Sequence, residues 1–164
     1  MESKGDNADV VQELINHGAD IFHTSLNNEN SLEVAVQKNH PNVLKCLLQA
    51  ANVAKTGGQS LFQPNIDGNN LLHHACKRGS LECTKILLEF DNEILRKDKN
   101  AVSMVSVKNK EGLLPVDLAK KGGQEKIKEA LDTYWEEKKL AADKMYNDIK
   151  TKEAAAQQLK MRKE

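Results

Sequence analysis

A hydrophobic pattern that recurs along the chain constrains the fold more than any other feature. Segments that begin at Asp9, Asn42 and Glu82 carry apolar residues at four matching positions, with Thr84 as the exception in the third segment. The spacing i, i+1, i+4, i+5 is typical of a short helix that packs on one side. The first two copies are offset by 33 residues. A period of this length indicates stacked helical units.

A second, shorter helix is predicted ahead of each later copy. The segments 30–35, 70–75 and 114–119 align with one another, and each ends in an alanine that fits a close contact between helices. Four residues after each alanine comes a residue suited to a tight turn, namely Asn39, Gly79 or Gly123. Each unit is therefore expected to contain two antiparallel helices.

These segments resemble the ankyrin repeat, with its turn, paired helices and Thr-Pro-Leu-His-x-Ala signature. The best copy runs from Asn65 to Ala75, and a weaker copy has Asp117 where the family has histidine. The resemblance covers roughly residues 4–131 and implies an all-α ankyrin-repeat solenoid of about three and a half helix-turn-helix repeats with inserted fingers. We expect an array over 1–131, with an incomplete first repeat, and a helical extension over 132–164.

The spacing of the repeats predicts two insertions. The alanines at 35, 75 and 119 lie 40 and 44 residues apart, which places extra residues within Asn52–Pro64 and Asp91–Lys108. The stretch 101–107 alternates apolar and polar residues, which indicates a half-buried strand or hairpin. We expect its apolar side to dock on the array, with docking on a partner as the alternative.

The first repeat lacks its first helix, because the residues before Asp9 are few and polar. We expect the chain to be a segment of a longer polypeptide, with an unusual N-terminal cap as the alternative.

The sequence of the C-terminal part predicts that it forms one long helix. From Gln124 to Glu164 there is neither proline nor glycine. Tyr134 and Trp135 are expected to cover the open end of the array. Beyond them a 3–4 spacing of apolar residues hints at a coiled-coil seam, interrupted by Lys138 and Lys152. We expect a solvated helix and a monomeric protein, with weak self-association through this helix as the alternative.

Composition argues against several classes of protein. The formal net charge is zero, so no basic field would attract nucleic acid. No apolar run approaches the length of a membrane span. Three cysteines at apolar helical positions fit free thiols in a reducing compartment. We expect a cytoplasmic location, which is the host cytosol if the Asn- and Lys-rich chain is a bacterial effector.

One cluster raises the possibility of chemistry. His73, His74, Cys76 and Cys83 could suggest zinc, but no Cys-x-x-Cys pair accompanies them. The resemblance implies a structural role for His73, whose position in the family ties neighbouring turns together. The sequence shows no convincing Ser-His-Asp or Cys-His set, so we expect neither an enzyme, nor a cofactor, nor a bound metal; a helical catalytic domain is the less favoured alternative.

The resemblance also implies a binding surface, because ankyrin arrays bind partners through turn tips and first helices on their concave side. Carried over by position, the candidate partner-binding residues are Leu26, Asn27, Gln37, Lys38, Ile66, Asp67, Asn69, Lys77, Arg78, Lys110, Glu111, Leu113 and Lys121. Ile66, Leu113, Lys77 and Arg78 are the stronger candidates. Apolar residues among cations fit a protein partner with acidic groups.

The function expected from these features is protein–protein recognition, by an adaptor or targeting segment of a larger intracellular protein. The binding contacts would come from the concave surface and the finger loops. The alternative is a regulatory or positioning segment of a larger enzyme or channel.

Overall fold

The fold is all-α over the residues that the structure, a computed structural model, describes: 7–26, 29–53, 63–98 and 100–162. The chain forms two compact units, residues 1–130 and 131–164. The helices are α1 (Ala8–Asn16), α2 (Ser31–Gln37), α3 (Pro41–Val53), α5 (Leu71–Arg78), α6 (Leu81–Lys97), the 3-10 helix η1 (Met104–Ser106), α7 (Pro115–Lys121) and α8 (Glu125–Met161).

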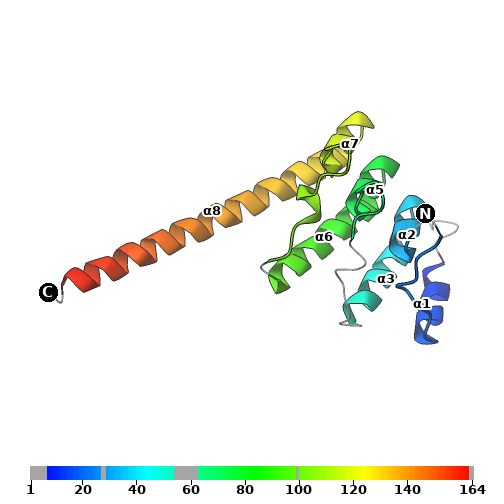
Figure 1. The fold of residues 1–164 in the computed structure, drawn as a ribbon, viewed down its shortest axis with the longest axis horizontal. Helices are drawn as coiled ribbons and strands as arrows, with labels where there is room; N and C mark the ends of the chain where they lie inside the picture. The colour runs from blue at the N-terminus through cyan, green and yellow to red at the C-terminus, as the bar shows by residue number, and fades with distance from the viewer. Residues whose placement is uncertain (1–6, 27–28, 54–62, 99, 163–164) are drawn as a thin grey trace. The chain divides into compact units, whose positions relative to one another are not determined.

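The helices of the first unit form two layers (Figure 1). The first helices of the repeats make one layer, in which α5 contacts both α2 and α7. The second helices make the other layer, in which α3 contacts both α1 and α6. Within a repeat, α2 packs on α3 and α5 on α6. This arrangement confirms the predicted order of short and long helices.

Capping side chains start the helices where the sequence pattern places them. The side chain of Asn30 accepts from the N–H of Glu33, and that of Asn70 accepts from the N–H of His73. Ser80 caps α6 in the same way, through Cys83 N–H at 3.3 Å. Each bond satisfies a backbone donor that the first turn of a helix leaves unpaired.

The predicted tight turns between paired helices have a left-handed backbone. Asn39, Gly79 and Gly123 have φ angles of 58°, 79° and 66°. Glycine adopts this conformation without steric cost, and asparagine tolerates it better than most residues. The three positions are therefore equivalent points of the repeat, as their matched spacing predicts.

Small and aliphatic side chains fill the core of the array. The repeat alanines Ala35, Ala75 and Ala119 are buried, as are Leu72 and Leu87. A buried alanine lets two helix backbones approach closely. By contrast α1 buries no residue, and its Val10 and Leu14 side chains are more than half exposed.

The second insertion differs from its prediction. Helix α6 continues to Lys97, and the expected strand at 101–107 is instead irregular chain with the single turn of η1. Met104 and Val105 of this turn are buried, and η1 contacts α5 and α7. The predicted docking on the array is thus confirmed, while the predicted strand or hairpin is wrong. Most of the first insertion, residues 54–62, lies outside the described residues.

The second unit consists of the helical chain of α8 from residue 131 onward. Tyr134 is buried, whereas Trp135 keeps 50% of its surface exposed. That these aromatic residues cover the end of the array stays a prediction. Among the described residues, no helix is both long and apolar enough to cross a membrane.

Candidate partner-binding surface

Two asparagines build the turns that precede α5 and α7. The side-chain oxygen of Asn65 accepts from the N–H groups of Asp67 and Asn69, each at 3.0 Å. Asn109 repeats this arrangement 44 residues later, with Glu111 N–H at 3.0 Å and Leu113 N–H at 2.9 Å. An asparagine that bonds its own following backbone fixes a tight turn without help from neighbouring helices.

These two turns are also bonded to each other. The Asn109 amide donates to the Asn69 side-chain oxygen at 3.0 Å, and Lys110 N–H donates to Asp67 C=O at 3.0 Å. Gly68, with φ 75°, lies so close that a Cβ there would be 2.9 Å from Lys110 N. The backbone of one turn therefore rests on the next, and the side chains at the tips are held in fixed relative positions.

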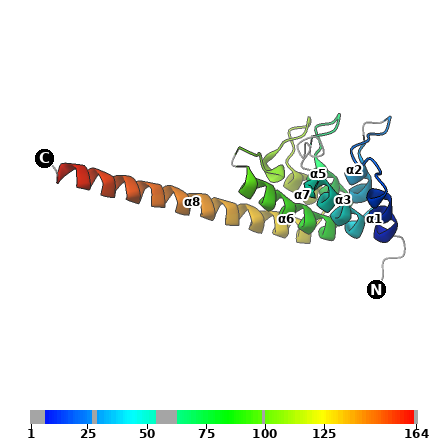
Figure 2. The same cartoon turned by 90° about the horizontal axis from the view of Figure 1, so that it is seen from below.

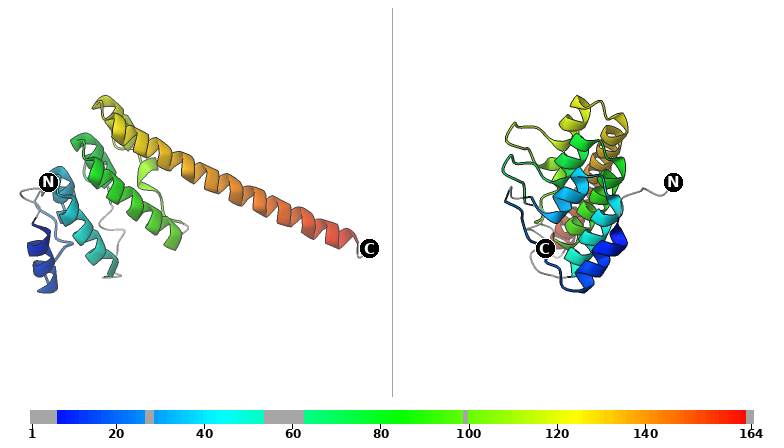
Figure 3. Two further views of the ribbon diagram at one scale, coloured as in Figure 1. Left: turned by 180° about the vertical axis from the view of Figure 1, so that it is seen from behind. Right: turned by 90° about the vertical axis from the view of Figure 1, so that its right-hand side faces the viewer.

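The tips present large exposed side chains on one side of the array. Figure 2 shows the loops before α2, α5 and α7 projecting together from the helices, and the right-hand view of Figure 3 shows the same. Leu26 and Ile66 occupy matching tip positions 40 residues apart and are fully and 70% exposed. Lys110 is the matching residue of the next turn and is also exposed.

The predicted cations lie away from the tips. Lys77 and Arg78 are exposed in the last turn of α5, and Lys121 is exposed in the last turn of α7. Lys38 is the exposed C-cap residue of α2. Helix C-termini favour cations, so these residues also stabilise their own helices. The candidate surface is consequently a strip that runs from the apolar tips to the basic helix ends. The eight residues of α5 account for about 12 Å of its length.

Some predicted residues are occupied by internal bonds. The side-chain oxygen of Asn69 accepts the hydrogen bond from Asn109 that joins the two turns. Leu113 is half-buried, and its carbonyl accepts a hydrogen bond from His73. Gln37 donates from its amide to Glu29 at 3.1 Å. Asn27 lies outside the described residues. The exposed members of the predicted set are Leu26, Lys38, Ile66, Asp67, Lys77, Arg78, Lys110, Glu111 and Lys121.

His73 links one repeat to the next, as the sequence resemblance implies. Its Nδ1 accepts from Asn70 N–H at 3.1 Å, and its Nε2 donates to the Leu113 carbonyl at 3.0 Å. These bonds require the neutral ring with the proton on Nε2. Burial lowers the pKa of His73, while the bond to Leu113 opposes that shift. The ring is therefore a neutral structural tie.

A buried carboxylate lies next to the second histidine, a feature that the sequence analysis missed. Glu33 Oε1 is 3.9 Å from His74 Nε2, and the Asn65 amide donates to the same Nε2 at 3.4 Å. Glu33 occupies in its repeat the place that His73 has in the next. Burial raises the pKa of Glu33; burial lowers that of His74, as do His73 and Lys77. The matching positions of Glu33 and His73 in their repeats were the sequence signal that could have predicted a buried Glu33.

Stability is expected to fall as the pH drops below about 6.5. The pKa of His73 and that of His74 are lowered in the fold, so the unfolded chain binds those protons first. Where only the unfolded form is protonated, each histidine lowers the free energy of unfolding by about 1.4 kcal/mol per pH unit. Glu33 has a raised pKa and acts in the opposite direction. Between pH 4.5 and the pKa of Glu33 in the folded protein, protonation of this residue stabilises the fold. Urea unfolding at pH 7.5, 6.5 and 5.5 measures the net slope.

A matched pair of substitutions tests whether His74 causes this dependence of stability on pH. His74→Gln should flatten it, whereas His23→Gln, at an exposed position, should leave it as in the natural chain. An unchanged slope in His74→Gln would show that His74 takes up its proton equally in the folded and unfolded states.

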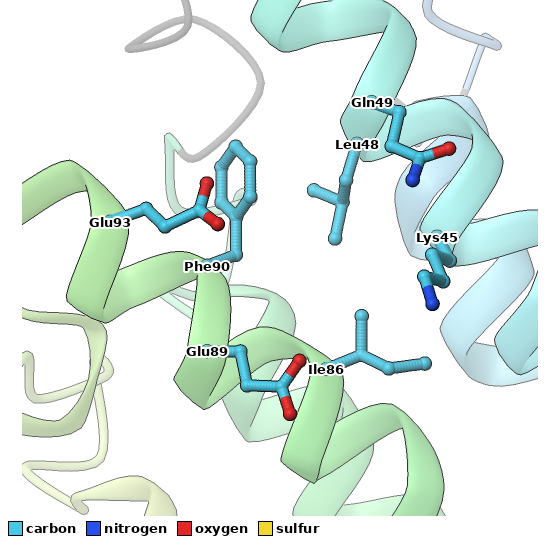
Figure 4. Close-up of a pocket in the computed structure, with 7 residues that line it drawn as sticks. All are labelled: Lys45, Leu48, Gln49, Ile86, Glu89, Phe90 and Glu93. Atoms are coloured by element: carbon cyan, nitrogen blue, oxygen red, sulfur yellow. The ribbon is translucent and has the colours of Figure 1, made fainter.

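The three cysteines are the other reactive groups that the sequence singles out. Cys46, Cys76 and Cys83 are buried and lie outside any disulfide, and burial raises the pKa of Cys76 to about 12, which keeps it a thiol. The described residues contain no group of three His, Cys, Asp or Glu side chains placed to hold a metal. Figure 4 shows an open groove between α3 and α6 where Leu48, Ile86 and Phe90 meet; it is lined further by Lys45, Gln49, Glu89 and Glu93.

Paired helices in two layers, stacked turns and an inter-repeat histidine define the class of protein, and the chain contains an ankyrin repeat. The family profile described as ankyrin repeat matches residues 67–99, which contain His73 and the whole of α5 and α6.

Two curated relatives share parts of the chain. Tyrosine-protein kinase HTK16 of Hydra vulgaris is 37% identical over 89 residues, which cover 54% of this chain and 11% of the kinase. Ankyrin repeat and SAM domain-containing protein 6 of Danio rerio is 27% identical over 131 residues, 80% of this chain and 16% of that protein. The chain thus spans less than a fifth of either relative's length.

Proposed function

We propose that the array is a protein-binding module, an adaptor or targeting segment in a larger cytoplasmic protein, and that it has no catalytic activity of its own. The observation that carries this proposal is the pair of exposed apolar tips, Leu26 and Ile66, with the Ile66 turn bonded rigidly to the turn that carries Lys110. Side chains held in place before a partner arrives lose less conformational entropy on binding.

The cations at the helix ends support a partner with acidic groups. Lys77 and Arg78 are exposed at the end of α5 that is opposite the Ile66 tip. An apolar anchor at one end of a strip and positive charge at the other would fix the orientation of a partner segment. Asp67 and Glu111 at the tips would exclude acidic residues there, which limits the expected acidic contacts to the helix ends.

Substitution of the strip should abolish partner capture. The variant Ile66→Ala, Lys77→Glu, Arg78→Glu removes the apolar anchor and reverses the charge of the basic end. We expect the partner's affinity to fall at least about a hundredfold, the sum of one lost apolar contact and two charge reversals. Affinity capture from cytosol with mass spectrometry identifies the partner, and titration calorimetry with the purified partner measures the loss.

The matched control is Val10→Ala, Lys85→Glu, Arg96→Glu, which makes the same changes on the second helices α1 and α6. It should bind as the natural chain does, and melting curves show whether both variants fold. Equal binding by both variants would move the contact to the inserted loops or the tail.

A second candidate function is regulation or positioning of a larger enzyme. It is favoured by the match to a tyrosine-protein kinase of which this chain spans only 11%. In that case the strip would bind another part of the same polypeptide. The two candidates are separated by the natural full-length protein: intramolecular binding would be independent of protein concentration, whereas binding to a separate partner would not.

A further inference from the structure

The tail helix carries an exposed stripe that the proposed binding function does not use. Between residues 135 and 159 of α8, six large hydrophobic side chains remain about half exposed or more. Leu140 and Tyr146 lie outside the stripe, and the other four lie on it: Trp135 50%, Met145 59%, Ile149 45% and Leu159 62%. Together with two exposed alanines and two lysines they occupy positions a and d of successive heptads. We call these eight residues the seam: Trp135, Lys138, Ala142, Met145, Ile149, Lys152, Ala156 and Leu159.

We propose that the seam is a self-association surface through which two copies of this chain pair as antiparallel helices. In an antiparallel pair, position a of one helix lies opposite position d of the other. Centred between Met145 and Ile149, the register sets Trp135 opposite Leu159, and Met145 opposite Ile149. It also sets each seam lysine, Lys138 or Lys152, opposite a small alanine, which leaves room for the long side chain.

The parallel arrangement is much poorer. In that register each seam residue faces its own copy, so Lys138 meets Lys138 and Lys152 meets Lys152 in the centre of the contact. The lysines that make a parallel coiled coil unfavourable are thus accommodated by the antiparallel one. The ammonium of Lys138 also lies 5.2 Å from the centroid of the Tyr134 ring in its own chain, and this cation–π contact stabilises its charge.

The charges beside the seam favour the same direction. In the antiparallel register, exposed Lys139 faces Glu153 of the second copy, and exposed Lys160 faces Asp132; each pair occurs twice by symmetry. In the parallel register Asp148 faces Glu153, a like-charge contact that also occurs twice. The antiparallel pair has one such conflict, because Asp148 meets its own copy near the symmetry axis. Charge complementarity therefore selects a second copy, reversed, as the occupant of the seam.

Charge reversal with mixing tests the proposal on the full chain. Lys139→Glu and Glu153→Lys should each weaken dimerisation roughly tenfold, because each converts two attractive contacts into two repulsive ones. Mixed in equal amounts, the two variants should recover the affinity of the natural chain, since both contacts are attractive in the mixed dimer. Sedimentation equilibrium of each variant and of the mixture measures the dissociation constants.

A control and two opposing outcomes complete the test. Lys144→Glu makes the same charge change as Lys139→Glu, but at a position that lies neither in the seam nor beside it. It loses an i,i+4 contact with Asp148, as Lys139→Glu loses one with Asp143, so it should dimerise as the natural chain does. Stronger dimerisation of Glu153→Lys would overturn the antiparallel register, because it relieves a parallel conflict. A natural chain that stays monomeric at about millimolar concentration would overturn the self-association itself.

Discussion

Replacing His73 by alanine is expected to lower the free energy of unfolding by about 3 kcal/mol. The ring is fully buried and bonds in two directions, to Asn70 N–H within its own repeat and to the Leu113 carbonyl of the next. Its removal leaves a cavity and deprives a buried N–H of its acceptor, and each effect costs on the order of 1–3 kcal/mol. Urea denaturation followed by circular dichroism measures the change.

Asp117 provides the comparison, because it holds the same position in the following repeat. Its carboxylate accepts from Leu114 N–H of its own helix start at 2.9 Å, and the residue is half-buried. Asp117→Ala should therefore cost about 1 kcal/mol, the usual effect of losing a capping side chain. If the two alanine variants were equally destabilised, the bond between His73 and Leu113 would contribute nothing to the coupling of repeats. A larger loss in His73→Ala would establish it as the inter-repeat tie.

The regular part of this fold could be read from the sequence because its determinants are local. Helix pairs, their order and the left-handed turn residues Asn39, Gly79 and Gly123 follow from hydrophobic period and turn chemistry, both of which act within about ten residues. The repeat multiplies the signal, since one register explains several segments. A position such as Ala75, which is fully buried, is recognisable because its equivalents share its environment.

The binding surface was predictable in outline but not residue by residue. Ile66 is exposed at a tip as its position implies, whereas the neighbouring Asn69 and Leu113 are bonded into the array. Those bonds join residues 40 apart, a separation at which periodicity gives no information about pairing. The recurrence of asparagine at 65 and 109, each followed by glycine three residues later, was the available signal. This recurrence marks turns in which some residues form hydrogen bonds within the array and are therefore not available to a partner.

The irregular insertion shows where local pattern fails. Alternation at 101–107 predicts a half-buried strand, yet Met104 and Val105 are adjacent and both buried, which a strand covered on one face does not allow. The cause is Asp91, buried on α6, whose carboxylate accepts from the Ser103 hydroxyl at 2.6 Å and from Met104 N–H at 2.8 Å. These two hydrogen bonds fix the first residues of the 3-10 helix η1 against α6. A single buried acid thirteen residues away thus overrides the local preference.

Replacing Asp91 by alanine is accordingly expected to release the insertion and to destabilise the array by about 2–4 kcal/mol. The substitution leaves the buried Met104 N–H without an acceptor, and the Met104 carbonyl, which accepts from the Asn70 amide at 2.9 Å, then loses its fixed position. Because Asn70 also caps α5, the disturbance should reach the helix that carries Lys77 and Arg78.

Hydrogen exchange and urea unfolding together measure the Asp91 effect. Exchange at the Met104 amide should accelerate at least about tenfold in Asp91→Ala, in keeping with a lost bond to a charged acceptor. Asp91→Asn keeps one acceptor oxygen in the same shape and should lose about half as much stability, while Glu93→Ala, at an exposed site on the same helix, should be close to neutral. Were Asp91→Ala as mild as Glu93→Ala, the apolar contacts of Met104 and Val105 would suffice to hold the insertion, and the buried carboxylate would be no more than an accommodated charge.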